Sequence, residues 1–306
     1  MLDKTIFSFP GWTKKAVSFT IDDGNLRLDK KFIDTVRPGG ITGSFNLCGI
    51  GKMGSLTPEE YREFYRGFEV TNHCKSHPKV ILPEDNYVIA DEPFDFATAD
   101  KEKIYKSNID GLYYKYFTTW WGYVATTEAY IKLIDEGKRE LESVFGEGSV
   151  VAYVWPYHSQ KDQRLHDHLK AAGYASVRTT GMADFTLPKD RMNWCYNANH
   201  TNLNARAAEF DALADDGELK WFCFGVHSHD FENNNCWDVL ETFVANYGNR
   251  PGDFWYATVR DILEYEDAVN LAEITDTEIT NNSGKELYAK IGEKKIVIPA
   301  NSTYKI

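Results

Sequence analysis

The sequence lacks the features of a disulfide-stabilised or membrane-spanning protein. Its five cysteines are odd in number and include no CxxC pair, which argues against a disulfide framework and favours a reducing compartment. No apolar run approaches the roughly 20 residues that a membrane helix needs. Residues 1–10 have neither the basic start nor the apolar core of a signal peptide. We therefore expect no membrane span, and we favour the cytoplasm while leaving the location open.

Positive charge is also scarce. Lysine and arginine number 34 against 46 acidic residues, and the net charge of -12 argues against binding to nucleic acid. The 306 residues do include 42% hydrophobic ones, enough for a sizeable core in one large barrel or two smaller domains. Aromatic residues make up 14% of the chain, and many lie in polar stretches. That distribution indicates a surface for a sugar-like or planar ligand in addition to a core.

The most informative stretch runs from Ala16 to Gly24. Apolar and β-branched residues end at two adjacent carboxylates, Asp22 and Asp23, which is the pattern of a buried strand with a charged tip. Neighbouring carboxylates at such a position are unfavourable unless a cation or hydrogen bonds compensate. A metal would make one acid a ligand and leave the other free as a base. The alternative is an ordinary strand end followed by an Asp-Gly turn.

A pair of histidines follows another short strand, Phe68–Val70. His73 and His77 are four residues apart, so on a helical or tightly turned segment both rings share one face and can hold one metal. Strands alternate with helices here, which predicts parallel βα units with their chemistry at the carboxyl ends of the strands. Two imidazoles and one carboxylate would leave coordination positions open, as in a catalytic site. The alternative is two solvent-exposed loop histidines.

Two motifs carry a resemblance to a known family. Phe19–Gly24 and Asn72–Pro78 resemble the first and second motifs of the polysaccharide deacetylases with the NodB-type fold, which are carbohydrate esterase family 4-like. They occur in the family's order, and the resemblance continues to about Tyr265. It implies an α/β fold, a distorted (β/α)7-type barrel, with one divalent metal ion.

The resemblance also implies roles for these residues. Asp23, His73 and His77 would be the metal ligands, and Asp22 would be the general base acting on metal-bound water. A set of two histidines and one carboxylate suits Zn²⁺, which we favour, and also Co²⁺, Mn²⁺, Fe²⁺ or Ni²⁺.

A third motif departs from the family pattern. The predicted strand Val150–Tyr157 ends in Trp155-Pro156-Tyr157, where the family usually has an arginine before Pro-Tyr. In the family that arginine orients the base, so the sequence leaves open what holds Asp22. By resemblance, the backbone N–H of Tyr157 would donate to the developing oxyanion, and Trp155 is a candidate substrate contact.

The fifth family motif is a strand-end histidine that protonates the leaving group. The predicted strand Trp221–Val226 leads directly to His227, which fits that role best. His229 lies on the same side under strand alternation and competes for the role, or contacts substrate. The alternative is that both are solvated loop residues.

Two segments fall outside the barrel pattern. Residues 79–123 predict a long inserted loop beside the active site, either a lid or sugar-stacking wall or a local mini-core. Trp120 and Trp121 in this insertion, and Trp194 in a later loop, are candidate substrate contacts. Short β-rich runs predict a small β appendage at 268–306, following a deacetylase barrel at 1–267.

Together these features predict a metal-dependent hydrolase that removes N- or O-linked acetyl groups from a carbohydrate. Asp22 would act as base and His227 as acid on an acetylated saccharide. One alternative is hydrolysis of a small non-peptide amide or imide on the same fold, which a closed pocket would favour. Another is a catalytically silent carbohydrate-binding protein. The sugar and the oligomeric state stay open.

Overall fold

The chain folds around a curled parallel sheet. The computed structural model describes residues 2–50, 56–82 and 84–306. Seven strands form the sheet in the order β11-β10-β4-β3-β2-β12, with β13 also paired to β2. The strands are β2 (Lys15–Asp23), β3 (Ser44–Leu47), β4 (Glu69–Asn72), β10 (Ala152–Val154), β11 (Ser176–Arg178), β12 (Lys220–His227) and β13 (Phe254–Tyr256). This confirms the predicted α/β fold with its distorted barrel.

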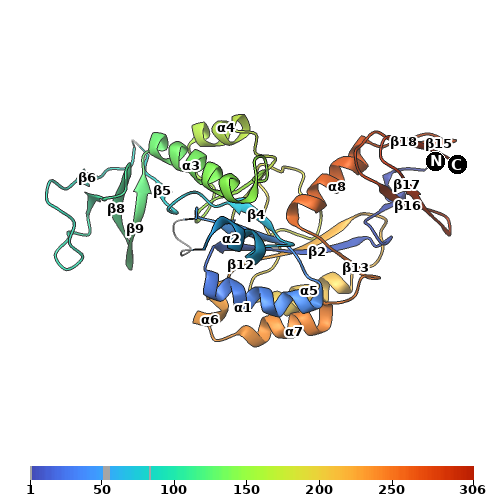
Figure 1. Ribbon diagram of the computed structural model, residues 1–306, viewed down its shortest axis with the longest axis horizontal. Helices are drawn as coiled ribbons and strands as arrows, with labels where there is room; N and C mark the ends of the chain where they lie inside the picture. Colours follow the sequence, from blue (N-terminus) through green and yellow to red (C-terminus); the bar gives the residue numbers. More distant parts are fainter. Residues whose placement is uncertain (1, 51–55, 83) are drawn as a thin grey trace.

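Helices follow most of these strands and cover the sheet. They are α1 (Leu26–Val36), α2 (Pro58–Phe64), α3 (Thr127–Phe145), α4 (Gln163–Ala171), α5 (Leu203–Asp211), α6 (Ser228–Asn233), α7 (Trp237–Tyr247) and α8 (Val259–Leu271). In Figure 1, α1, α6 and α7 lie along one side of the strands, with α3 and α4 along the other. Thr57 caps α2, and Pro58 is its first residue. Among the described residues, no helix has the length and apolar character to cross a membrane.

The central strand β2 sets the position of the site. Phe19 in this strand is fully buried and packs edge-to-face against Phe32 at 4.9 Å between ring centroids. The register of β2 places His227 of β12 opposite Asp22, and Asn46 of β3 opposite Asp22 on the other side. Because the strands are parallel, their polar ends meet at one edge of the sheet.

The inserted segment forms a sheet of its own. Its strands are β5 (Lys79–Val80), β6 (Val88–Ile89), β7 (Lys103–Lys106), β8 (Leu112–Phe117) and β9 (Trp120–Ala125), in the order β5-β9-β8-β7-β6. Figure 1 shows this sheet at one end of the molecule's long axis. The sequence predicted the insertion but not its strands, because aromatic residues and lysines are mixed along them without a clear alternation. A small core of Ile81, Ile104 and Val124 supports the mini-core interpretation.

The predicted β appendage lies at the opposite end (Figure 1). Its strands are β14 (Glu273–Ile274), β15 (Glu278–Asn281), β16 (Leu287–Ile291), β17 (Lys294–Ile298) and β18 (Ser302–Lys305). The order of one three-stranded sheet is β14-β15-β18. The other, β1-β16-β17, includes β1 (Phe7–Ser8) from the start of the chain. The predicted boundary at 267/268 falls inside α8, and the division into two domains stays a prediction.

Glu69, the first residue of β4, is a buried acid at the opposite end of the strand from its carboxyl tip. Its carboxylate accepts hydrogen bonds from the Ser44 hydroxyl and from the backbone N–H of Arg260 at the first turn of α8. Burial raises the pKa of Glu69 to about 7 from its ordinary value of 4.5, although both hydrogen bonds act in the opposite direction. Glu69 therefore binds a proton more tightly in the folded state than in the unfolded state.

This difference predicts a pH-dependent stability. The contribution of protonated Glu69 is fully present below about pH 4.5 and is lost as the pH rises through about 7. At about 1.4 kcal/mol per pKa unit, the loss is on the order of 3 kcal/mol. We predict that Glu69→Gln removes this slope when the free energy of unfolding in urea is compared at acidic and mildly alkaline pH. Identical slopes in wild type and variant would contradict the assignment.

Candidate active site

The carboxyl ends of the strands surround a cavity of about 510 Å³. Side chains predicted from separate motifs meet in its lining, together with one from the insertion. They are Asp22, Asp23, His73, His77, Trp120, Tyr157 and His227. The structure thus brings the predicted base, ligands, oxyanion donor and acid to one place.

The backbone around this cavity is strained. Asp23, His77 and Tyr157 have left-handed φ angles of 79°, 51° and 63°. A residue with a side chain loses roughly 1–2 kcal/mol in this conformation, and such residues persist where the surrounding structure holds them, often at functional sites. The clustering of three such residues around one cavity indicates a functional site.

Asp22 is held by two donors. Its Oδ1 atom accepts a 2.6 Å hydrogen bond from Asn46 Nδ2 and an ion-paired hydrogen bond from the Arg178 guanidinium. Burial alone would raise the pKa of Asp22, but Arg178, followed by His73 and His227, lowers it below the ordinary value. Asp22 is therefore ionised and able to accept a proton.

Arg178 is one residue of the site that the sequence analysis did not identify. It ends strand β11 and is 1% exposed. The register of β10 with β11 pairs Arg178 with Val154, which directly precedes Trp155 of the third motif. A guanidinium thus reaches Asp22 from the neighbouring strand instead of from the motif. The available signal was an arginine that ends a short buried strand.

Asp23 faces the two histidines of the second motif. The Nε2 atoms of His73 and His77 each lie 3.5 Å from Asp23 Oδ1. His73 Nδ1 lies 2.9 Å from the Val154 carbonyl oxygen, which fixes the proton on that nitrogen and leaves the Nε2 lone pair facing Asp23. Ligands at about 2.1 Å from a tetrahedral Zn²⁺ lie about 3.4 Å from one another. The two distances from Asp23 Oδ1 to the histidines match this spacing.

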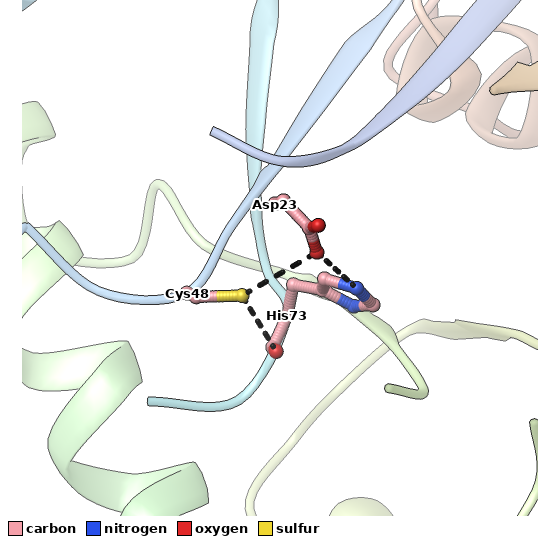
Figure 2. Close-up of side chains that lie close together, drawn as sticks. All are labelled: Asp23, Cys48 and His73. Carbon is pink, nitrogen blue, oxygen red and sulfur yellow. Dashed lines mark hydrogen bonds and ion pairs between the residues drawn. The ribbon is translucent and has the colours of Figure 1, made fainter. Parts of the chain in front are cut away.

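A cysteine lies beside this set. Figure 2 shows the Cys48 thiol beside Asp23 and His73, with Sγ 3.9 Å from Asp23 Oδ1 and 3.6 Å from the His73 carbonyl oxygen. Asp23, Cys48 and His73 offer ligand atoms within 4.8 Å of one another, as do Asp23, His227 and His229. The sequence analysis did not identify Cys48, because a lone cysteine after a strand matches no known spacing of metal ligands. Asp23 is common to all three sets.

His227 is held by Asp230 and lies near several carboxylates. Its Nδ1 lies 3.0 Å from Asp230 Oδ2, which also accepts its backbone N–H. Burial favours the neutral ring, but the Asp230 hydrogen bond and the charges of Asp22 and Asp23 outweigh it and raise the pKa of His227 to about 9. His229 stacks on His227 at 4.6 Å between ring centroids, and burial and the His227 charge lower its pKa. This geometry favours His227 over His229.

The four candidate tryptophans separate by burial. Trp120 lines the cavity and is 45% exposed, whereas Trp121 lines an adjoining groove. Trp155 is 1% exposed and packs edge-to-face on Tyr153, and Trp194 is 4% exposed and borders a different cavity of about 810 Å³. Both belong to the buried core and neither lines the active-site cavity. This geometry does not favour a substrate contact for either residue, and that call stays a prediction.

Seven further residues complete the lining. They are Thr180, Tyr196, Asn199, His200, Gly225, Val226 and Asp230. His200 Nδ1 lies 3.7 Å from Asp230 Oδ2, so a second imidazole faces the partner of His227. The first four lie in the irregular connection between β11 and α5, where no periodicity provides a signal.

Comparison with known proteins identifies the family. The sequence profile described as "Polysaccharide deacetylase" matches residues 11–177, more than half of the chain. The chain belongs to the polysaccharide deacetylase family. Membership confirms the resemblance found in the motifs, and it supports deacetylation of carbohydrates in a family that generally uses a divalent metal. No curated protein matches the chain.

Several solved structures are similar to this chain, and one with a TM-score above 0.5 agrees on the fold. A protein from Mycobacterium smegmatis described as a polysaccharide deacetylase is 16% identical, with a TM-score of 0.51, over 88% of this chain and 96% of that chain. A CE4 esterase from Streptococcus mutans is 16% identical, with a TM-score of 0.47, over 80% of this chain and 86% of that chain. At these identities the likeness concerns the fold alone.

The alternative ligand sets predict different effects of substitutions on metal affinity. We predict that His77→Ala weakens Zn²⁺ binding by about 100-fold or more, because it removes a ligand. Cys48→Ala is the matched control, and we expect its affinity to stay within about threefold of wild type, because Asp23, His73 and His77 remain. Competition with a chromophoric chelator measures both affinities. A larger loss in Cys48→Ala than in His77→Ala would overturn the predicted ligand set.

Proposed function

We propose that this protein is a metal-dependent hydrolase that removes N- or O-linked acetyl groups from a saccharide. One observation carries the proposal: two adjacent carboxylates have different partners. Asp22 is held by Arg178 and Asn46, whereas Asp23 faces two imidazoles. This division separates a base from a ligand, as the reaction requires.

Asp23, His73 and His77 would hold the metal, for which Zn²⁺ is the favoured ion and Co²⁺, Mn²⁺, Fe²⁺ and Ni²⁺ are alternatives. A bound ion would lower the pKa of its water ligand and polarise the acyl carbonyl. Asp22 takes the proton of the attacking water. Arg178 and Asn46 both bind Oδ1 of Asp22, so they hold the carboxylate in one orientation and leave Oδ2 for the water.

Tyr157 supplies a donor to the developing oxyanion. Among the described residues, its backbone N–H has no hydrogen-bond acceptor, and its left-handed conformation follows the end of β10 at the cavity. A backbone donor held in advance of the reaction stabilises negative charge without reorganisation. The Tyr157 ring packs at 4.6 Å on His77, which ties this turn to the second motif.

His227 supplies the proton at the end of the reaction. As an imidazolium it gives the proton to the departing amine or alkoxide. Asp230 orients its ring through Nδ1, which leaves Nε2 on the side of Asp23. The ion pair between Arg178 and Asp22 also argues against a silent binding protein, because it does for the base what the absent third-motif arginine does in the family.

The proposal is tested by acetate release from a panel of acetylated saccharides. Metal-stripped protein should release none, and restoring Zn²⁺, Co²⁺ or Mn²⁺ should restore release. Stoichiometric metal binding without release from any saccharide would contradict the proposal. It would favour a small-amide or imide hydrolase or a silent carbohydrate-binding protein.

The base is tested by Asp22→Asn. This change keeps the shape of the side chain and removes its ability to accept a proton. We expect kcat to fall about 10³-fold or more, whereas Zn²⁺ affinity stays near that of wild type. Retained turnover, or a parallel loss of metal, would show that Asp22 is not a separate base.

The orienting role of Arg178 is tested by Arg178→Lys, which keeps the buried charge but loses the planar fork of donors. We expect kcat to fall about tenfold or more with KM and Zn²⁺ affinity nearly unchanged, since only the base is misplaced. Arg191→Lys, which changes an arginine paired with Glu266 and Asp267, is the matched control. Equal kcat values in the two variants would contradict an orienting role.

A further inference from the structure

A separate cavity of about 300 Å³ lies between the inserted sheet and the barrel. The inserted sheet contributes Lys79 of β5, Val124 of β9, and Lys115 and Phe117 of β8. The barrel contributes the turn after β10, at residues 158–161. We call this space the basic cavity. Among the described residues, it shares none of its lining with the active-site cavity.

The basic cavity concentrates positive charge in a chain whose net charge is -12. Lys79, Lys115 and Lys161 all line it. The one carboxylate among its described lining residues belongs to Asp85, and Oδ2 of that group already accepts the backbone N–H of Leu82. Like charges held close together are unfavourable unless an opposite charge compensates them.

The three lysines lack such compensation within the protein. In the part of the chain that the structure describes, no carboxylate oxygen lies within 4.0 Å of any of their Nζ atoms. By contrast, Lys103 of the same inserted sheet pairs with Glu92 at 2.9 Å. The Nζ atom of Lys79 lies instead 5.7 Å from the centroid of the Phe117 ring, which also lines the cavity. The compensating charge therefore has to come from solvent or from a ligand.

The pairing of the inserted strands brings two of the lysines to one face of their sheet. Lys79 lies opposite Val124 of β9, which in turn lies opposite Tyr113 of β8. Lys115 follows Tyr113 by two residues, so it projects from the same face as Lys79. Lys161 approaches from the barrel. An anion in the basic cavity would thus contact both parts of the molecule.

The barrel side of the basic cavity is held in place and adds further polar groups. Gln160 Nε2 donates to the His158 carbonyl oxygen at 2.8 Å. The Ser159 backbone N–H donates to Thr179 Oγ1 at 2.8 Å. His158 and Ser159 also line the cavity, and an imidazole and a hydroxyl can both donate to an anion. Ammonium, hydroxyl and imidazole donors together suit a phosphate group, for which lysine is a common ligand.

We propose that the basic cavity binds a phosphate group, either as the free ion or as part of a small phosphate ester. By neutralising lysines from the inserted sheet and from the barrel, the bound phosphate would hold the two parts together. The Phe117 ring lies 6.4 Å from that of Tyr157, so this bridge would also fix the insertion beside the active site. The inference does not depend on the proposed function.

The test is calorimetric titration of the metal-loaded protein with inorganic phosphate and with methyl phosphate. Lys115→Met keeps the apolar stem and removes the charge, and we expect it to weaken binding of both probes about tenfold or more. Lys79→Met should have the same effect. Lys106→Met, which changes an exposed lysine of the inserted sheet outside the cavity, is the matched control and should bind like wild type. Absence of binding, or equal affinities in Lys115→Met and Lys106→Met, would overturn the proposal.

Phosphate can also bind to a metal in the active site, and a second titration separates the two events. Binding that persists in metal-free protein and is weakened by Lys115→Met supports the basic cavity. Binding that disappears with the metal and is indifferent to Lys115→Met contradicts it. Tighter binding of methyl phosphate identifies an ester as the ligand, whereas tighter binding of inorganic phosphate identifies the free ion. Malonate serves as a carboxylate dianion, and tighter binding of malonate than of either phosphate would overturn the assignment to phosphate.

Discussion

The site depends on keeping two adjacent carboxylates in different environments at the tip of one buried strand. Asp22 and Asp23 are consecutive, so the negative charge of one carboxylate disfavours ionisation of the other. The structure meets this constraint by giving each acid its own positive or hydrogen-bonding partners. Arg178 and Asn46 bind Asp22, while His73 and His77 face Asp23. The left-handed backbone at Asp23 accompanies this division, because strict strand alternation alone would only point the two side chains to opposite faces.

The barrel brings these partners together from strands that are distant in sequence. Asn46 comes from the neighbour of β2 on one side, and His227 comes from β12 on the other. Arg178 reaches the base from β11, several strands away in the sheet order, which requires the sheet to curl. The division of roles therefore depends on the curl of the sheet. A flat sheet of the same strands would leave Asp22 without its guanidinium.

The sequence predicted what local patterns encode. The carboxylate pair after an apolar run and the histidines four apart showed where strands end, and parallel βα units imply that strand ends meet. Arg178 could not be predicted in the same way, since its role depends on sheet curvature and on the register of β10 with β11. Trp155 and Trp194 look like Trp120 in the sequence, but burial separates them, and burial is decided by packing between distant elements. The strands of the insertion were missed for a related reason, as most of their stability comes from pairing with one another.

The most direct test of the account is a crystal structure of the metal-loaded protein with anomalous data at the absorption edge of the bound ion. The account predicts one ion on Asp23, His73 and His77, with Asp22 off the ion and still bound to Arg178 and Asn46. An ion that bridges both carboxylates, or one that Cys48 binds in place of His77, would contradict the separation of base and ligand on which the proposed chemistry depends.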